Sequence, residues 1–448
     1  MQAPAAVATT TSALTRTVFD RLQVFVQPLV ERLDAALDVR LVRTFTATLR
    51  VLLQNRYRAG GLLLSELGAL LLSPEHAAAG TKRLSNLLLS ERWSADALRD
   101  FLWEQASRQL DGMICRHERP LVIWDESVWE KPESIELEGL CAVRSSEAER
   151  LKRVRKGFYK PPPGKVFVPG MQWLGLLLIG RVGPPALAAM RWWTTRGVHA
   201  EEKREVEGSL LKRCAKEWGG AVVHIFDRGF AGAPWLEACA GTGIRFVMRW
   251  PARYHLKDVL GLEKQAAWKM TRGKRTRDSR SLWDSHARRW HRTGVVWVQV
   301  RHPAYPGPLW LVVSRRGPGK KPWYLLTNEY VDCPAHAWDV VLAYARRWQI
   351  EMAWRFLKHE LAMESPRLWK WENRQKLLLM VSLVYAFLLS LLRPEMKELR
   401  EDLLRRFCPR TGKRSRSTPA PLYRLRIAIC YLWSAFLLDC ARVALNSG

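Results

Sequence analysis

The chain has 448 residues, with 72 lysines and arginines against 43 aspartates and glutamates, which gives a formal net charge of +29. This length accommodates more than one domain and a large core. The excess charge, interleaved with 22 tryptophans, favours a polyanionic partner, most simply nucleic acid, with an acidic membrane surface as the alternative. The eight cysteines contain no C-x-x-C pair and no grouping with histidine at zinc spacing, which argues against a zinc-binding module and favours a reduced, cytoplasmic setting.

Residues 1–115 have repeated apolar spacing and few strand signals, so we expect this segment to be helical. Within it, Lys82 and Arg83 lie where one helix opens, and Ser94 is placed to cap the next. Two short helices with a basic edge predict a DNA-binding region. A helical bundle with a charged surface explains the same pattern equally well.

Residues 116–251 alternate buried-strand runs with helices. The apolar run LVIWD ends on Asp125, and the later run AVVHIFD ends on Asp227. The other elements that we expect here are strands at 171–180, 186–195 and 244–251 and helices at 200–218 and 233–240. This order of strands and helices is that of a ribonuclease H-like fold, which predicts an α/β catalytic core with both acids at strand ends.

Residues 252–335 interrupt the core with alternating strand patterns and predict a β-rich insertion. Residues 336–395 complete the core, beginning with one long helix. Within them, the apolar run Leu377–Leu392 is shorter than the ~20 residues needed to span a membrane, so we expect a buried helix. Residues 396–448 predict a helical C-terminal region, a candidate for dimerisation.

The long helix contains the sequence YARRWQIEMAWRFLK. At 100° per residue, four of its polar side chains fall within an arc of about 60°, namely Tyr344, Arg347, Glu351 and Lys358. A broad apolar face lies opposite and would pack against the core, so the polar stripe would point into a cleft. Such a stripe is suited to hold a divalent metal and grip phosphate oxygens, although the same residue types also occur on solvated helix surfaces.

Three carboxylates, Asp125, Asp227 and Glu351, thus lie on elements that a ribonuclease H-like sheet brings together. Three such groups cannot lie close at neutral pH without cations. Hard oxygen ligands suit Mg²⁺ or Mn²⁺, and two such ions about 3.5–4 Å apart activate the attacking oxygen and stabilise the leaving oxygen of a phosphodiester. The sequence contains no G-x-x-x-x-G-K motif, so ATP is not implied.

These motifs resemble those of DDE transposases of the insertion sequence four family. The family signature Y-x2-R-x3-E-x6-K is matched, with every spacing intact, by Tyr344, Arg347, Glu351 and Lys358. The first acid of the family lies in a D-x-[ST] context and the second in a strand-D-R-[GE] context, which are matched by Asp125-Glu126-Ser127 and Asp227-Arg228-Gly229. The β-rich insertion is also typical of the family, and the resemblance covers residues 120–395.

The resemblance implies a mechanism in which the three acids hold two metal ions. Water would nick the transposon end, the freed 3′-hydroxyl would attack the opposite strand to leave a hairpin, and the end would then be joined to target DNA. The DNA contacts that follow from the resemblance, together with nearby basic candidates, are Tyr344, Arg347, Lys358, Trp323, Arg228, Arg355, Lys82 and Arg83.

Three of these assignments leave alternatives open. Trp323 in WYLLTNE matches a family tryptophan that stacks on a flipped base, but it alternates with Leu325 and also fits a core position. Arg228 would contact a phosphate or close a salt bridge. Glu126 would replace Asp125 as a metal ligand if the strand register differed by one residue.

The sequence therefore predicts a transposase of a bacterial insertion sequence that cuts and joins DNA. Its predicted partners are double-stranded DNA, as terminal inverted repeats and target, and a second copy of the chain in the DNA complex. It predicts a cytoplasmic, nucleoid-associated protein without a membrane partner. The alternatives are a non-catalytic DNA-binding protein derived from such an enzyme and a ribonuclease H-like nuclease that cuts without joining.

Overall fold

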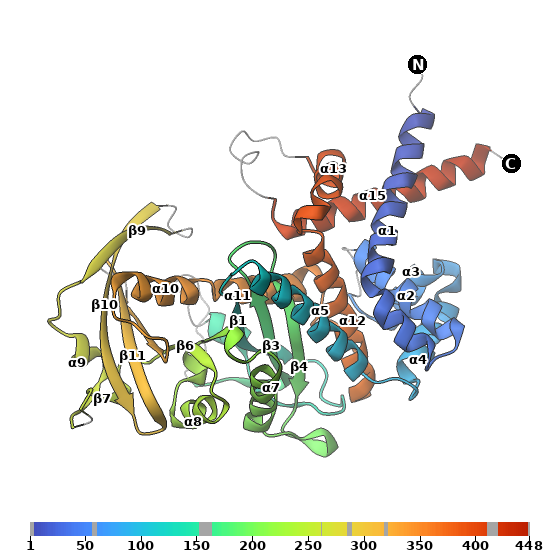
Figure 1. The fold of residues 1–448 in the computed structure, drawn as a ribbon. Coiled ribbons are helices and arrows are strands. Elements are labelled where there is room, and N and C mark those ends of the chain that lie inside the picture. Colours follow the sequence, from blue (N-terminus) through green and yellow to red (C-terminus); the bar gives the residue numbers. More distant parts are fainter. Residues whose placement is uncertain are drawn as a thin grey trace.

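Helices gather at one end of the molecule and long antiparallel strands at the other, with a mixed sheet between them (Figure 1). The computed structural model describes residues 4–55, 61–151, 164–260, 262–284, 289–317, 321–409 and 420–446. The predicted mixed α/β class is confirmed. The boundaries of the predicted domains stay predictions.

The sheet comprises 12 strands among the described residues. Its main path runs through β2 (Cys141–Arg144), β3 (Phe167–Ile179), β1 (Leu121–Glu130), β5 (Val223–Phe226), β6 (Arg245–Arg249), β12 (Trp323–Thr327), β11 (Tyr305–Arg316), β10 (Arg289–His302), β7 (His255–Lys257) and β8 (Lys264–Ala266). Off this path, β4 (Ala186–Trp193) pairs with β3, and β9 (Asp278–Asp284) pairs with β10.

Helices cover both faces of this sheet and form the opposite end of the molecule. The α-helices are α1 (Pro4–Asp34), α2 (Val39–Gln54), α3 (Leu64–Leu71), α4 (Ala77–Leu89), α5 (Asp96–Cys115), α6 (Ser146–Leu151), α7 (Lys203–Glu217), α8 (Ala233–Thr242), α9 (Ala267–Thr271), α10 (Pro334–Ala345), α11 (Trp348–Arg355), α12 (Trp371–Ser390), α13 (Lys397–Phe407) and α15 (Leu422–Asn446). The shorter helical turns are η1 (Pro74–His76), η2 (Gly197–His199), η3 (Gly219–Ala221), η4 (Arg228–Phe230), the π-helix η5 (Phe356–Glu360) and η6 (Pro394–Met396).

The part of the sheet that includes β1 and β5, which bear Asp125 and precede Asp227, has the strand order β4-β3-β1-β5-β6. β1, β5 and β6 are parallel, whereas β3 is antiparallel to both β1 and β4. The first half of β1 is buried on both faces, which explains its continuous apolar sequence. Leu121 and Ile123 belong to the apolar cluster of α10 and α12, and Val122 and Trp124 to that of α7 and α8.

The strands of the predicted insertion continue the core sheet. β12 pairs antiparallel with β6, with Leu325 opposite Arg249, and β11 and β10 follow in turn. The region is β-rich, as the alternating patterns predict. Because these strands share the sheet of the core, residues at their ends lie near the same edge as Asp125 and Asp227.

The apolar run that follows the site is an internal helix, as predicted. α12 is buried along almost its whole length and packs against α2, α4 and α5, while α15 packs against α1, α2 and α13. No described helix is by itself long and apolar enough to cross a membrane, although α12 and the segment Pro394–Phe407, bent by 83°, meet that requirement of length and composition as a pair.

The prediction of one long helix around Glu351 is wrong in part. Helix begins at Pro334, but it is interrupted between Ala345 and Trp348 and ends in a π-helix. At the interruption the backbone tightens to three-residue hydrogen bonds, including Arg347 N to Tyr344 O at 3.0 Å. The two consecutive arginines there bind in different places, Arg346 to the β3–β4 turn and Arg347 to Asp125, which the tightened turn allows.

Candidate active site

Asp125 lies in the middle of β1, where the strand stops being buried on both faces. Its Oδ2 accepts a hydrogen bond from Trp354 Nε1 at 3.0 Å, and its Oδ1 lies 3.5 Å from Nη1 of Arg347. Both partners come from α11 and the turn before it. The acid at the end of the LVIWD run therefore faces the segment that carries Glu351.

Gly175 allows this contact with Trp354. It is paired with Asp125 across β1 and β3, and a Cβ built on it would lie 2.0 Å from the Trp354 ring. Any side chain at this position would displace the indole. The absence of a side chain on β3 thus fixes the position of a hydrogen-bond donor to Asp125.

Asp227 follows β5 directly and is brought beside Asp125 by the sheet register. The parallel pairs Leu121–Val223 and Ile123–Ile225 place the two acids at equivalent positions two residues further on. Neighbouring strands lie about 4.8 Å apart, so the two backbones are adjacent where β1 and β5 reach this edge. Asp227 Oδ1 accepts a hydrogen bond from Gly229 N at 2.5 Å, which fixes the turn after β5.

Glu351 lies on α11 and forms an ion pair with Nη2 of Arg347. The guanidinium of Arg347 thus bridges Glu351 and Asp125. Burial raises the pKa of Asp125 to about 7, while the positive charge of Arg347 opposes the rise and the negative charges of Asp227 and Glu351 add to it. The charges of Asp227 and Glu351 therefore both act on Asp125, and all three acids act on Arg347.

The spacing of the acids differs from that of a tight single-ion site. Among the residues that the structure describes, the three side chains whose ligand atoms all lie within 4.8 Å of one another are Asp332, Cys333 and His336. The three predicted acids do not meet that spacing, since Arg347 bridges two of them. A pair of ions about 3.5–4 Å apart spans a wider set of ligands, and three carboxylates are the donors that Mg²⁺ and Mn²⁺ prefer. The donor set fits such a pair.

Tyr344 is buried at the end of α10 and interacts with the site through Arg347, to which it is hydrogen-bonded. Burial raises the pKa of its hydroxyl, while the charges of Arg347 and Arg249 oppose that rise. Its ring packs edge-on against Trp323, with ring centroids 5.2 Å apart. The aromatic residue of the predicted stripe therefore contacts the tryptophan that was identified separately on β12.

Trp323 is half-buried, and its ring is covered by a cation. The guanidinium of Arg316 lies 3.6 Å from the ring centroid and that of Arg249 lies 5.6 Å away. Both expectations for Trp323, a core position and a base-stacking position, are compatible with the structure. The side chain packs against the core, and its ring is also in contact with the two arginines. Base stacking stays a prediction.

Arg249 and Arg316 were not identified from the sequence. The pKa of Arg249 is lowered to about 10, mainly by burial and also by the like charges of Arg228, Arg316 and Arg347, while Tyr344 opposes the change. Four guanidinium groups from four separate segments therefore converge beside the acids. Each of the two missed arginines ends an apolar strand, as Asp125 and Asp227 do, and that shared position was the available signal.

Lys358 lies on the π-helix and binds next to the site. Its Nζ donates to the carbonyl oxygen of Val128 on β1 at 3.1 Å and lies 2.7 Å from Glu364 Oε1. It therefore contacts the same strand as Asp125, three residues further along. Its predicted role in phosphate binding stays a prediction.

The remaining predicted cations are all exposed. Arg228 follows Asp227, and Arg355 lies in the last turn of α11. Lys82 and Arg83 lie on α4, which packs against α2, α3 and α12 at the helical end of the molecule (Figure 1). The structure therefore gathers the first two near the acids and leaves the last two on a separate surface.

Glu126, the next residue on β1, points to the opposite face of the strand from Asp125. Its Oε2 lies 2.6 Å from Nζ of Lys203 on α7, and it shares a hydrogen bond with the buried Glu207. Burial and the charge of Glu126 raise the pKa of Glu207 to about 7. In the observed register, Asp125 and not Glu126 meets Arg347.

Comparison with known proteins identifies the segment that contains two of these acids. Residues 203–387 match the family model of the transposase DDE domain. The match includes Asp227 and Glu351 and begins after Asp125. Among solved structures, the chain is similar to one described as a piggyBac transposase synaptic complex with hairpin DNA, with 12% identity, a TM-score of 0.42 and coverage of 90% of this chain and 73% of that chain. Among curated proteins, none matches.

Proposed function

We propose that this protein is a DNA transposase of the insertion sequence four family that cuts and joins DNA through divalent metal ions. One observation carries the proposal: Asp125 and Asp227 occupy equivalent positions on neighbouring parallel strands, and Arg347 links Asp125 to Glu351. The match of residues 203–387 to the transposase DDE domain supports it. The intact signature from Tyr344 to Lys358 supports the choice of family.

The strand order supports a ribonuclease H-like core. Three strands, β4, β3 and β1, form an antiparallel group, and β5 and β6 continue from β1 in parallel. This arrangement puts Asp125, in the middle of β1, beside Asp227, which directly follows the shorter β5. This proximity supports a single site built from residues of separate segments.

Asp125, Asp227 and Glu351 would hold two Mg²⁺ or Mn²⁺ ions. When bound, such ions supply an activated attacking oxygen and stabilise the leaving oxygen of the phosphodiester. The raised pKa of Asp125 supports this assignment, because cations favour the charged form of a carboxylate that burial otherwise disfavours. Arg347 supplies positive charge between Asp125 and Glu351.

The surrounding cations would hold the DNA. The guanidinium groups of Arg228, Arg249, Arg316 and Arg347 lie beside the acids. They are suited to phosphate oxygens, which accept hydrogen bonds from two donors of one guanidinium. Tyr344 orients Arg347 through its hydroxyl. Trp323 would stack on a base that leaves the duplex when a hairpin forms, and Arg316 would then move from its ring to a phosphate.

The proposed substrates are the terminal inverted repeats of a bacterial insertion sequence and its target DNA. The enzyme would act as a homodimer on paired ends, in the cytoplasm and in association with the nucleoid. The net charge of +29 supports a nucleic-acid partner. The intact acids argue against a pure DNA-binding protein, since binding does not require them.

Cleavage and strand transfer on DNA that carries the element's own ends test the proposal. Purified protein with Mg²⁺ should nick the end, form a hairpin and join the end to a second DNA. Binding without any cutting would favour the non-catalytic protein, and cutting without joining would favour the nuclease. Glu401→Gln, which changes an exposed glutamate on α13, is a control that should retain all three steps.

A further inference from the structure

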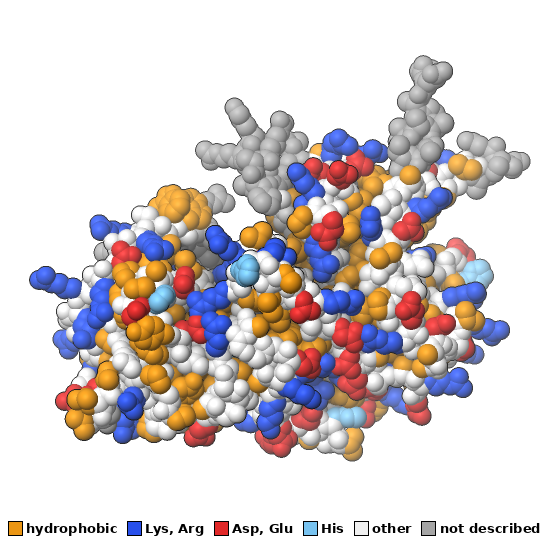
Figure 2. Space-filling view, viewed as in Figure 1, with side chains coloured by type: hydrophobic (Ala, Val, Ile, Leu, Met, Phe, Trp, Pro, Cys, Tyr) orange, Lys and Arg blue, Asp and Glu red, His pale blue; other side chains and the backbone are white. Residues whose placement is uncertain are grey.

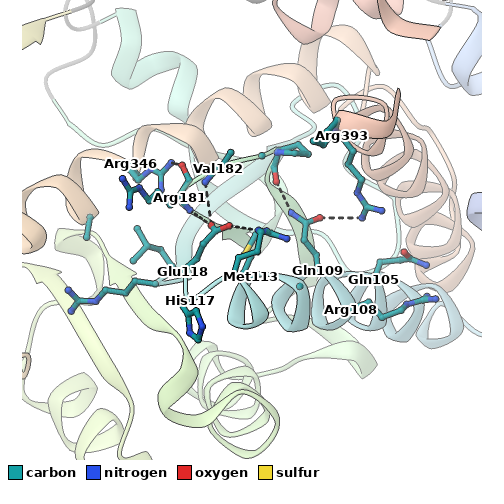
Figure 3. Close-up of a pocket in the computed structure, with 18 of the residues that line it drawn as sticks. Gln105, Arg108, Gln109, Met113, His117, Glu118, Arg181, Val182, Arg346 and Arg393 are labelled. Atoms are coloured by element: carbon teal, nitrogen blue, oxygen red, sulfur yellow. Dashed lines mark hydrogen bonds and ion pairs between the residues drawn. The ribbon is translucent and has the colours of Figure 1, made fainter. Parts of the chain in front are cut away.

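A large groove lies on the other side of the Arg346–Arg347 turn from the acids. It encloses about 1390 Å³ between α5, the start of β1, the β3–β4 turn, α10 and η6 (Figure 3). This exceeds the ~300–1,000 Å³ of typical small-molecule pockets, and the groove is open along one side. Its shape therefore suits part of a polymer better than an enclosed small ligand.

The lining of the groove is strongly cationic. Six arginines line it, against three carboxylates, and these are Arg108, Arg116, Arg119, Arg181, Arg346 and Arg393. The carboxylate of Glu118 is almost completely buried and accepts from Arg116 at 2.8 Å and from the backbone N–H groups of Arg181 and Val182. The Glu118 carboxylate is therefore already hydrogen-bonded inside the wall of the groove, and it exposes little negative charge to the open side.

The walls of the groove are fixed by hydrogen bonds. Arg346 donates to the carbonyl oxygens of Gly180 and Arg181, and Gln109 Nε2 donates to that of Pro184 at 2.7 Å (Figure 3). The β3–β4 turn is thus held from both α10 and α5. A ligand would meet a surface that is already formed, which lowers the entropic cost of binding.

Arg108 and Arg181 carry the strongest evidence for a ligand. Both side chains are exposed, and within the part of the chain that the structure describes neither forms an ion pair. They stand on opposite walls, on α5 and on the β3–β4 turn (Figure 3). Each guanidinium can therefore bind a phosphate without breaking an ion pair within the described residues.

The groove is joined to the candidate active site by two elements. Leu121, which lines it, precedes Asp125 by four residues on β1, a distance of about 13 Å along a strand. Arg346 lies in the groove, and the next residue, Arg347, contacts Asp125. At 3.4 Å per base pair, the separation of Asp125 from Leu121, at the near edge of the groove, corresponds to about four base pairs of duplex.

We propose that this groove binds the phosphate backbone of duplex DNA about four base pairs from the phosphodiester that reacts at the acids. The inference rests on the proposed function and adds a second contact surface to it. Arg108 and Arg181 each neutralise a phosphate, and Arg346 couples the groove to the site through its neighbour Arg347. The surface is separate from the predicted DNA contacts Tyr344, Arg347 and Lys358.

The salt dependence of binding tests the groove. A fluorescein-labelled duplex of about 30 base pairs, titrated with full-length protein at several salt concentrations, gives the slope of log K against log salt. Arg108→Gln together with Arg181→Gln should reduce that slope by about 1.8, since each lost phosphate contact removes about 0.9. Thermal melting in the same buffers should show that the double variant is folded.

Lys212→Gln together with Lys216→Gln is the matched control. These lysines are exposed on α7 and do not line the groove, and the change removes the same charge. The control should keep the wild-type slope. An equal loss of slope in both double variants would overturn the proposal, because net charge alone would then explain the effect.

Two further results separate this inference from the proposed function. Two shortened duplexes are compared, each ending two base pairs from the cleavage site, one on either side of it. One of the two lacks the DNA that would reach the groove, and on that duplex the groove variant should bind as well as wild type. A groove variant that binds every duplex like wild type, while wild type cuts DNA, would overturn the inference and leave the proposed function standing. A wild-type protein that neither cuts nor binds DNA would instead overturn the proposed function.

Discussion

Asp125 and Glu126 are neighbours on β1 but face opposite sides of the sheet, and the two sides are built differently. Asp125 meets Arg347, which lies 222 residues further along the chain, and is close to acids from β5 and α11. Glu126 meets Lys203 and Glu207, which belong to one helix. On both sides burial raises the pKa of a carboxyl to about 7, that of Asp125 on one and that of Glu207 on the other.

The two sides differ in where the partners of each carboxyl group come from. Glu207 is fully buried and its oxygens are bound by Lys203 and Arg204 of its own helix, so its cluster ties α7 to the sheet. Around Asp125, like charges from distant segments converge at a partly open edge. A carboxyl group with a raised pKa is present on both sides. Charged residues from several distant segments meet only around Asp125.

The largest expected effect separates the two faces directly. Glu351→Gln should reduce DNA cleavage by at least ~10³-fold, because it removes a charged oxygen ligand from a unit of three acids. Glu126→Gln should reduce it by less than ~10-fold, since its partners lie on α7. Gel assays of nicking measure both, and gel-shift assays should show end binding nearly unchanged. Nicking by Glu351→Gln at the wild-type rate would remove Glu351 from the site.

The next effect tests how Asp125 is positioned. Gly175→Ala should slow cleavage by about 10²-fold, because the new Cβ displaces the Trp354 ring and with it the hydrogen bond to Asp125. Gly208→Ala on α7 is the control, since a Cβ there meets no atom within 4 Å. Equal rates for the two variants would show that the indole does not position Asp125.

A smaller effect concerns one step of the reaction. Trp323→Ala should slow hairpin formation roughly tenfold while leaving first-strand nicking nearly unchanged, because stacking on a flipped base contributes about 1–3 kcal/mol. Trp323→Phe should recover part of the loss. Denaturing gels resolve the nicked and hairpin products. If both steps slowed equally, the tryptophan would be a core residue only.

The smallest effect is on stability and depends on pH. The folded chain holds a proton on Asp125 up to about pH 7, whereas the unfolded chain releases it near 3.8. Asp125 therefore lowers the free energy of unfolding, and the loss becomes larger as the pH rises between these two values. In metal-free buffer, Asp125→Asn should therefore raise Tm by roughly a few °C at pH 8 and have little effect at pH 4. A Tm difference that does not change with pH would contradict the raised pKa.

Glu207→Gln provides the matching test on the other face. It should also raise Tm at pH 8 more than at pH 4, because burial and the charge of Glu126 raise the pKa of Glu207. Unlike Asp125→Asn, it should leave cleavage largely intact. Loss of cleavage in this variant would show that the α7 cluster takes part in the reaction.

Much of the core was predictable from sequence because buried strands carry continuous apolar runs. AVVHIFD ends at its acid as predicted, because β5 stops at Phe226, whereas LVIWD is only the buried first half of a strand that continues past Asp125 to Glu130. The chemistry of a carboxylate at a strand end then indicates a site. Strand pairing brings such ends together, which explains why distant acids were identifiable.

Features that depend on three-dimensional packing were not predictable. The break at Arg346–Arg347 arises because neighbouring side chains bind the β3–β4 turn and Asp125, and helix periodicity contains no sign of either partner. Arg249 and Arg316 reach Trp323 only because β12 joins the core sheet between β6 and β11. The need for a glycine at position 175 likewise depends on Trp354 lying over β3, which the sequence does not indicate.

The binding of Mn²⁺ tests the account's central claim most directly. Electron paramagnetic resonance of free Mn²⁺, with duplex DNA present, measures affinity without any dependence on activity. Asp227→Asn should weaken binding by at least ~10-fold relative to wild type, and Glu126→Gln should bind as wild type does. Wild-type affinity in Asp227→Asn would contradict a metal site built from Asp125, Asp227 and Glu351.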